Sequence, residues 1–373
     1  YLINFRKQLH QNPELSGSEV ITAKHVVDEL KKCNPIEIIS NVGGTGVIAF
    51  FGDEKADKTL LFRSELDALP IQEINTFSHT SKNKGISHKC GHDGHSTILL
   101  GLAKKLSDNT IKGIKVILLF QPAEENGEGA KAILKDEKFN NIKPDFVFAL
   151  HNVPGFPMGS IIVRKNAFTP AVTSIKISLE GKTSHAAEPE FGISPDMAIS
   201  ELIKNIKALD NNNLDSDNFC VITTVYTQLG SEDYGISAGN AELDFTIRCW
   251  TVDTLNSLKK SIEKEVDTIR KKYGLVSKNK WFYEFMPNMN DSEAVEYITK
   301  AAIANNYSII YKEYPFKWGE DFGLFTQHFK GAMFALGAGK NTPALHNPDY
   351  DFPDELISKG VTMMFSIIKS FYA

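Results

Sequence analysis

Apolar residues recur at helical spacing at the start of the chain and then gather into short continuous runs. Leu2, Phe5 and Leu9 lie on one face of a first predicted helix, and a second is expected from about Ser18 to Lys32. The apolar runs predict strands at 46–51, 59–62, 113–120 and 145–150, with a helix at 96–106. Such nearly continuous runs are typical of strands buried on both faces of a mixed or parallel α/β sheet.

The pattern changes after about residue 170 to the strict alternation of half-exposed strands. A strand is expected at 172–180, a helix at 195–208, strands at 219–229 and 241–250, a helix at 252–273 and a strand near 280–285. This βαββαβ order is ferredoxin-like. The earlier pattern resumes with a helix at 292–305 and a strand at 331–336. The sequence therefore predicts an α/β protein whose discontinuous core domain (1–170 and 287–373) carries an inserted α+β lid domain (171–286).

Composition narrows the class of protein. The 373 residues include 41 Lys and Arg against 46 Asp and Glu, a net charge of −5. A slightly acidic balance argues against a nucleic-acid partner. No apolar run approaches the roughly 20 residues needed to span a bilayer, so we expect no membrane segment. Four cysteines in a chain of this length do not form a disulfide framework, which favours a reducing compartment and a cytoplasmic location.

Side chains that bind metals follow the predicted core strands. They are Glu65 and Asp67 after 59–62, Cys90, His92, Asp93 and His95 before the helix at 96, Glu124 and Glu125 after 113–120, His151 after 145–150, and His346 beyond 331–336. Ligands of open α/β sheets lie beyond the carboxyl ends of the strands. Thiol, imidazole and carboxylate groups are the ones that bind Zn²⁺ or Mn²⁺. Their joint placement indicates a metal site.

Cys90 has three interpretations. It is a small buried hydrophobic residue, a metal ligand, or a nucleophile with His92 as its base. Gly91 allows Cys90 and His92 to approach a common point, and a helix N-terminus favours the thiolate that binds metal. Adjacent residues in a tight turn rarely direct a thiol and an imidazole at each other and at a substrate. Metal ligation is therefore the preferred interpretation.

The adjacent acids Glu124 and Glu125 follow the most apolar predicted strand. They are either a solvated loop pair or the two carboxylates of a hydrolytic metal site, one a ligand and the other free to take a proton from water. Taken alone, His151 is better interpreted as a buried structural histidine, and His346 is similarly ambiguous; beside the other groups His151 becomes a candidate ligand. The remaining histidines are interpreted as structural: His10, His25, His79, His88, His95 and His328.

Six motifs together resemble one family. They are Leu9-His10 with Pro13-Glu14, Arg63–Pro70 (RSELDALP), Cys90–His95 (CGHDGH), Phe120–Glu125 (FQPAEE), Leu150-His151 with Pro154-Gly155, and Gly181–Ala186 (GKTSHA). In this order they resemble the metallo-amidohydrolases and metallopeptidases that include hippurate hydrolase, N-acyl-amino-acid amidohydrolase and the hydrolases of auxin–amino-acid conjugates. Glu320-Asp321-Phe322 and His346-Asn347-Pro348 extend the resemblance over essentially the whole chain.

The resemblance implies a zinc-peptidase-like catalytic domain and a role for each matching residue. The ligands of two divalent ions (Zn, Mn, Co or Ni) would be Cys90, His92, Glu125, His151 and His346. Glu124 would be the general base, while Asp67 and Asp93 would orient imidazoles. His185 in the lid would reach the active site of the partner subunit in a homodimer, and Arg248 would contact the substrate carboxylate.

The chain departs from the family pattern at three places. Gly235 begins a Gly-Ile-Ser-Ala run where the family has Asn-Val-Ile-Pro, Glu65 replaces an Asp, and Leu345 replaces a His. None of these is a predicted ligand or Glu124, so we expect an active enzyme that hydrolyses the amide bond of small N-acyl amino acids. The alternatives are a metallo-carboxypeptidase or dipeptidase, and a metal-binding relative without catalysis.

Overall fold

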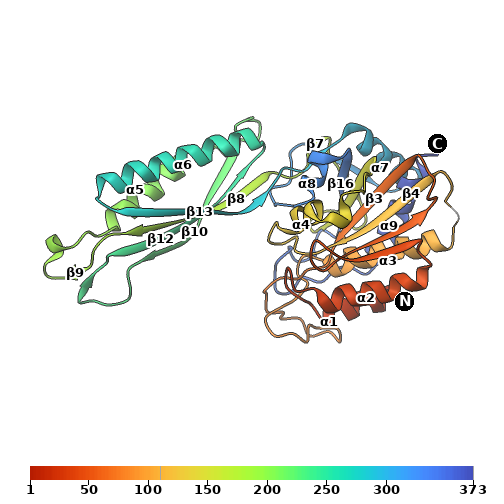
Figure 1. Cartoon of the computed structure of the whole chain (residues 1–373), viewed down its shortest axis with the longest axis horizontal. Coiled ribbons are helices and arrows are strands. Elements are labelled where there is room, and N and C mark those ends of the chain that lie inside the picture. Colours follow the sequence, from red (N-terminus) through yellow and green to blue (C-terminus); the bar gives the residue numbers. More distant parts are fainter. Residues whose placement is uncertain (110, 373) are drawn as a thin grey trace. The chain divides into compact units, whose positions relative to one another are not determined.

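An eight-stranded mixed sheet forms the centre of the larger of two units of the chain (Figure 1). The computed structural model describes residues 1–109 and 111–372. The larger unit, here called the core unit, comprises Tyr1–Phe168, Asn288–Pro315 and the described residues from Glu320 on. The insert unit comprises Thr169–Pro287 and Phe316–Gly319.

The core sheet has the strand order β1-β2-β4-β3-β5-β16-β6-β15. Its strands are β1 (Glu37–Val42), β2 (Gly46–Gly52), β3 (Lys58–Glu65), β4 (Ile114–Gln121), β5 (Phe146–Val153), β6 (Ile161–Val163), β15 (Ile309–Tyr311) and β16 (Gly331–Gly337). The four central strands β4, β3, β5 and β16 pair in parallel. Their carboxyl ends therefore meet at one edge of the sheet, where the candidate metal ligands follow.

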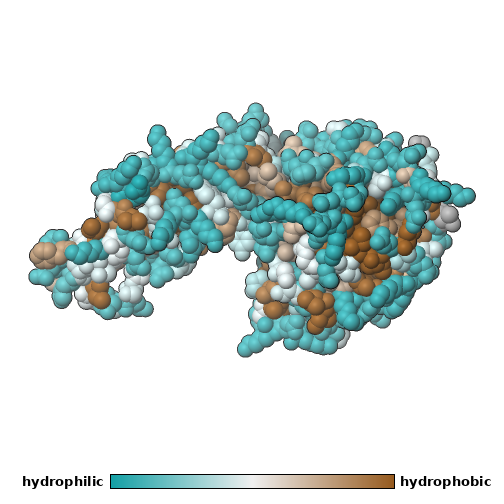
Figure 2. Space-filling model, viewed as in Figure 1, coloured by the Kyte–Doolittle hydropathy of each residue, from teal (hydrophilic) through white to brown (hydrophobic). Residues whose placement is uncertain are grey.

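Helices pack on this sheet and against one another. They are α1 (Leu2–Gln11), α2 (Val20–Leu30), α3 (His92–Ser107), α4 (Gly129–Lys135), α7 (Ser292–Ala304), α8 (Gly323–His328) and α9 (Glu355–Lys369). Helix α3 contacts α1, α9 and the central strands, and nearly all of its residues are buried. Apolar side chains of strands and helices form one buried cluster. The surface view in Figure 2 is mostly hydrophilic, with separate apolar patches.

The insert unit follows the predicted element order. Its elements are β8 (Ala171–Glu180), α5 (Asp196–Lys207), β10 (Cys220–Leu229), β12 (Asn240–Cys249), α6 (Val252–Lys272) and β13 (Val276–Phe285). The strands form an antiparallel sheet in the order β10-β12-β8-β13, and α5 and α6 lie along one of its faces (Figure 1). Thr251 caps α6, because its hydroxyl oxygen accepts the Thr254 N–H at 3.1 Å.

Short ribbons and single-turn helices complete the two units. They are β7 (Asn166–Ala167), β9 (Ser184–His185), β11 (Ile236–Ser237), β14 (Met289–Asn290), and the 3₁₀ turns Lys31–Cys33, Glu137–Phe139 and Pro189–Phe191. Strand β9 pairs with β11, and β14 pairs with β7. None of the helices in the described ranges combines the length and apolarity that a bilayer crossing requires.

The structure extends the predicted elements at several points. The helix expected at 96–106 begins at His92. The prediction missed its first turn, because the buried polar residues there show no apolar periodicity. The last insert strand begins at Val276 rather than near 280. The long helix α9 and the strands β1, β6 and β15 were not predicted, the last two because three residues are too few to show a pattern.

Candidate metal centre

A sharp turn between Cys90 and α3 brings the thiol and the first imidazole together. Gly91 precedes the helix with a φ of +95°, in the left-handed region. A Cβ atom added to it would lie 2.5 Å from Oδ1 of Asn152, so only glycine fits this approach. Cys90 and His92, on either side, are 7% and 1% exposed.

The loops at the strand ends bring the five predicted ligands close together. One group of possible ligands joins Cys90, His92 and His151, and a second joins Cys90, Glu125 and His346. Within each group the ligand atoms lie within 4.8 Å of one another. The two groups share Cys90, which is the arrangement that two neighbouring ions with a common ligand require.

The hydrogen bonds of His92 and His151, the two buried histidines among the predicted ligands, fix the same ring tautomer in each. Nδ1 of His92 donates to the backbone oxygen of Asp67 at 2.9 Å and lies 3.2 Å from its Oδ1. Nδ1 of His151 donates to the backbone oxygen of Asn152 at 2.8 Å. Because these oxygens only accept, each Nδ1 carries a proton and each Nε2 presents a lone pair to the site.

Two polar atoms at the centre of the cluster have no hydrogen-bond partner among the described residues. They are Nε2 of His92 and Oε1 of Glu125, both buried and 3.8 Å apart. Orphaned buried polar atoms are costly in a folded protein. A divalent ion ligated by both would satisfy them, so the residues present fit a metal centre.

Buried carboxylates give the cluster a negative electrostatic environment. Burial raises the pKa of Glu125 to about 7, and burial with the charges of Glu125 and Glu124 raises the pKa of the Cys90 thiol. Although burial acts in the opposite direction, Asp67 and the other carboxylates raise the pKa of His92 to about 10. Burial and these carboxylates therefore oppose the thiolate that the helix N-terminus was expected to favour.

Glu124 and Glu125 direct their carboxylates to different partners. The Glu125 oxygens lie 3.8 Å from Nε2 of His92 and 3.8 Å from Nε2 of His346. Glu124 lies 3.8 Å from the same His92 nitrogen and extends toward Glu320 and Asp321. Burial and the charge of Glu320 raise the pKa of Glu124 above its usual range. The Glu125 carboxylate thus lies between two imidazoles, and the Glu124 carboxylate lies beside the His92 imidazole.

The loop that carries both acids is held by a residue that the sequence did not suggest. Ala123 adopts a φ of +53°, which costs a non-glycine residue about 1–2 kcal/mol. Its N–H donates to Oε1 of the fully buried Glu19 at 2.9 Å. Glu19 also accepts from the N–H of Gly17 and the hydroxyl of Thr45. Nothing near Glu19 in the sequence signals this contact.

The two predicted orienting carboxylates have different environments. Asp67 binds His92 through Oδ1, and its Oδ2 accepts the N–H of Glu125 at 2.9 Å. It therefore positions two predicted ligands together. Asp93 was also expected to orient an imidazole of the site, but its Oδ2 accepts from His10 at 2.9 Å and Arg6 at 3.1 Å. The helix turns this side chain toward α1 rather than toward the ligands.

Two further buried residues of the site were missed or interpreted as structural. His95 contacts the His151 ring edge-to-face and binds Oε2 of Glu65 at 2.6 Å. Arg63 is fully buried and forms ion pairs with Glu65, Glu320 and Asp321. Its charge offsets the acids beside Glu124. The sequence did offer one signal for this residue, a charged arginine at the end of the apolar run of β3.

His346 reaches the cluster from a strained backbone. Its φ is +67°, and its N–H donates to the backbone oxygen of Lys89 at 2.8 Å, directly beside Cys90. The side chain is 52% exposed, in contrast to the buried His92 and His151. It is therefore the predicted ligand that solvent reaches most easily.

His185 and Arg248 lie in the insert unit. His185 belongs to β9, is exposed, and accepts the Ala187 N–H at Nδ1 over 3.0 Å, so its proton is on Nε2. Gly235, which replaces the family asparagine, accepts the N–H of Ala186 at 3.0 Å. The departure therefore adjoins His185. Arg248 lies in β12, and burial lowers the pKa of its guanidinium.

Comparisons with known proteins agree over most of the chain. Residues 61–370 match the sequence model of peptidase family M20/M25/M40. Hippurate hydrolase of Campylobacter jejuni is 31% identical, over 96% of this chain and 93% of its own. N-acetyl-L-cysteine deacetylase of Bacillus subtilis is 31% identical, over 99% of this chain and 87% of its own. A Bacillus subtilis structure described as a dinuclear metal-binding peptidase superposes with a TM-score of 0.83 at 27% identity. The match covers 100% of this chain and 97% of that one.

Proposed function

We propose that this chain, which belongs to peptidase family M20/M25/M40, hydrolyses the amide bond of N-acyl amino acids or related small conjugates with two divalent metal ions. The observation that carries the proposal is the pair of ligand groups that share Cys90 around the unpartnered atoms of His92 and Glu125. The names of the relatives, a hippurate hydrolase and acetyl-amino-acid deacetylases, support the amide substrate class.

Each predicted ligand has a place in this proposal. Two ions of Zn, Mn, Co or Ni would be held by Cys90, His92, Glu125, His151 and His346. Such ions polarise a substrate carbonyl and acidify an attacking water when they are bound. Asp67 keeps His92 in the tautomer that ligates, and it also holds the backbone of Glu125. This double contact would fix two of the ligands relative to each other.

Glu124 would act as the general base. It lies beside His92 without the second imidazole neighbour that Glu125 has, so its carboxylate is available for proton transfer. It would take a proton from the attacking water and return it to the nitrogen of the leaving amine. Its raised pKa brings the group closer to the value at which it both accepts and donates near neutral pH.

We further propose that the segment 171–286 is a lid and dimerisation domain on the catalytic domain of 1–170 and 287–373. Strand β10 is an edge of the insert sheet and exposes Val225, Tyr226 and Leu229. A second copy could pair along this edge in a two-fold dimer. His185 would donate a hydrogen bond from its Nε2–H to the substrate carbonyl in the partner's site, and Arg248 would bind the substrate carboxylate.

The free cysteines favour a cytoplasmic location.

The rival thiol mechanism has a specific geometric difficulty. The Cys90 thiol lies 3.5 Å from Nε2 of His151, at hydrogen-bond distance, whereas the mechanism requires His92 as its base. Burial lowers the pKa of His151 and raises that of the thiol, so a thiolate–imidazolium pair is disfavoured. The same groups suit a bound cation, since each then ligates in its uncharged imidazole or thiolate form.

A substrate panel on metal-reconstituted protein tests the proposed function. N-acetyl and N-benzoyl amino acids should be hydrolysed, with loss of activity in a chelator and recovery with Mn²⁺, Zn²⁺ or Co²⁺. Amine release measured across the panel distinguishes the alternatives. Preferential cleavage of dipeptides would indicate a peptidase. Turnover that resists the chelator would indicate the thiol mechanism, and no turnover by fully metal-loaded protein would indicate a non-catalytic relative.

A further inference from the structure

Two cysteines of the insert unit lie directly opposite each other on neighbouring strands. Cys220 is the first residue of β10, and its partner in the register of the sheet is Cys249, the last residue of β12. Both are free thiols, 2% and 0% exposed, within the apolar cluster of the insert unit. Directly opposed residues of paired strands direct their side chains to the same face.

The hydrogen bonds show which kind of cross-strand pair this is. The N–H and the carbonyl of Cys220 both bind Asn211, on the side of β10 away from β12. The N–H of Ile222 points the same way and donates to Asp210. Cys220 and Cys249 are therefore a non-hydrogen-bonded pair, in which the Cα atoms lie about 4.5 Å apart. Disulfides require a Cα separation of about 4.4–6.8 Å.

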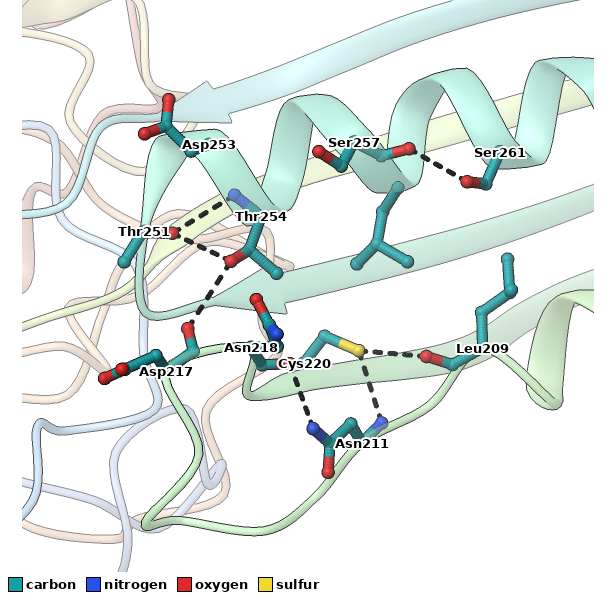
Figure 3. Close-up of a pocket in the computed structure, with 11 residues that line it drawn as sticks. Leu209, Asn211, Asp217, Asn218, Cys220, Thr251, Asp253, Thr254, Ser257 and Ser261 are labelled. Atoms are coloured by element: carbon teal, nitrogen blue, oxygen red, sulfur yellow. Dashed lines mark hydrogen bonds between the residues drawn. The ribbon is translucent and has the colours of Figure 1, made fainter.

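Cys220 is one of the residues that line a surface groove of the insert unit. The groove has a volume of about 450 Å³ and lies between the first turns of α6 and the segment from Leu209 to Cys220. Figure 3 shows the sulfur among Leu209, Asn211 and the start of α6. The thiol donates to the backbone oxygen of Leu209 at 3.1 Å and accepts the Asn211 N–H at 3.2 Å. The groove is therefore the side from which a small disulfide would approach the buried Cys220 thiol.

We propose that Cys220 and Cys249 form a reversible cross-strand disulfide by exchange with a low-molecular-weight disulfide such as oxidised glutathione. The Cys220 thiolate attacks one sulfur of the small disulfide and releases one small thiol, which leaves a mixed disulfide on Cys220. The Cys249 thiolate then attacks the Cys220 sulfur and releases the second small thiol. Two protein thiols are oxidised, two small thiols form, and the two protons pass to the released thiolates.

The environment of the two thiols predicts slow exchange. Burial raises the pKa of Cys220 and raises that of Cys249 to about 12, so the thiolate fraction of each is small. Turning the Cys220 sulfur toward Cys249 would break its hydrogen bonds to Leu209 and to the Asn211 N–H, but that N–H would keep the Cys220 carbonyl as its acceptor. Equilibrium rather than rate is therefore the quantity to measure. The inference does not depend on the proposed hydrolase activity.

Redox titration of the full-length protein tests the inference. The protein is equilibrated anaerobically with oxidised and reduced glutathione at varied ratios, quenched in acid, alkylated and digested with trypsin. Cleavage at Lys207, Arg248 and Lys259 places the two cysteines in separate peptides, residues 208–248 and 249–259. We expect these peptides to be joined and to separate on reduction. The equilibrium constant for forming the disulfide against glutathione should be at least about tenfold larger in the folded protein than in the urea-unfolded chain.

Two variants serve as controls. Cys220→Ser should abolish the joined peptides, whereas Cys33→Ser, which changes a buried cysteine of the core unit, should leave them unchanged. Peptide mapping of the unaltered protein decides the question even if a variant folds poorly. The inference is overturned if no ratio joins the peptides, if Cys220 stops at the glutathione adduct, or if the folded and unfolded constants are equal.

Discussion

Replacing Glu124 with glutamine should lower kcat by about 10²–10⁴-fold and leave the metal content unchanged. The amide keeps the size of the side chain but cannot accept the proton of the attacking water. Among the described residues, one imidazole, that of His92, lies within 4 Å of the Glu124 carboxylate, whereas two lie that close to Glu125, so we expect the loss of Glu124 to spare the bound metal. Metal content by mass spectrometry and kcat, both measured on the same sample, provide the test.

The neighbouring acid gives a matched control for this substitution. Glu125→Gln makes the same chemical change one residue away, but Glu125 lies between His92 and His346. It should therefore lower the metal affinity as well as the rate. Equal metal loss in both variants, or normal metal content in both, would show that the roles of base and ligand are assigned wrongly.

Replacing His185 with alanine should lower kcat by about 10²–10³-fold, the effect of removing one donor to a developing oxyanion. The residue lies in the insert unit, away from the ligand groups in the sequence and in a short exposed strand, so metal content and folding should not change. His328→Ala, an exposed histidine of α8, should have no effect on kcat and is the control.

Mixing two inactive variants then tests whether His185 acts across a dimer. In a heterodimer of His185→Ala and Glu124→Gln subunits, one of the two sites combines an intact Glu124 with an intact His185 from the partner. Activity should therefore return when the subunits are exchanged. Verified heterodimers without recovered turnover would place His185 in the site of its own subunit, or outside catalysis.

Local pattern predicted where candidate ligand side chains lie in the core unit, whereas the family resemblance supplied the role of each residue. Short apolar runs marked the parallel strands, and residues that follow them, such as Glu125 and His151, lie close to Cys90 and His92 at the start of α3. The reason is general, since parallel strands end at one edge of a sheet. The element order of the insert unit was equally readable from its alternation.

Contacts between distant segments could not be predicted in this way. Glu19 and Ala123 are far apart in the sequence, and neither residue type signals that one holds the other. Asp93 follows His92 directly, yet it binds His10 and Arg6 of α1, because the two side chains leave the helix in different directions. Such partners depend on how helices pack, which periodicity alone does not specify.

Titration of metal-free protein with Mn²⁺ or Co²⁺ tests the central claim most directly. Hydrolysis of an N-acyl amino acid is followed against the number of metal equivalents added per chain, with bound metal measured in parallel. The account predicts no turnover without metal and full turnover at two equivalents, with both bound ions lost from the Cys90→Ala variant because Cys90 belongs to both ligand groups. Full turnover at one equivalent, or turnover without any bound metal, would contradict it.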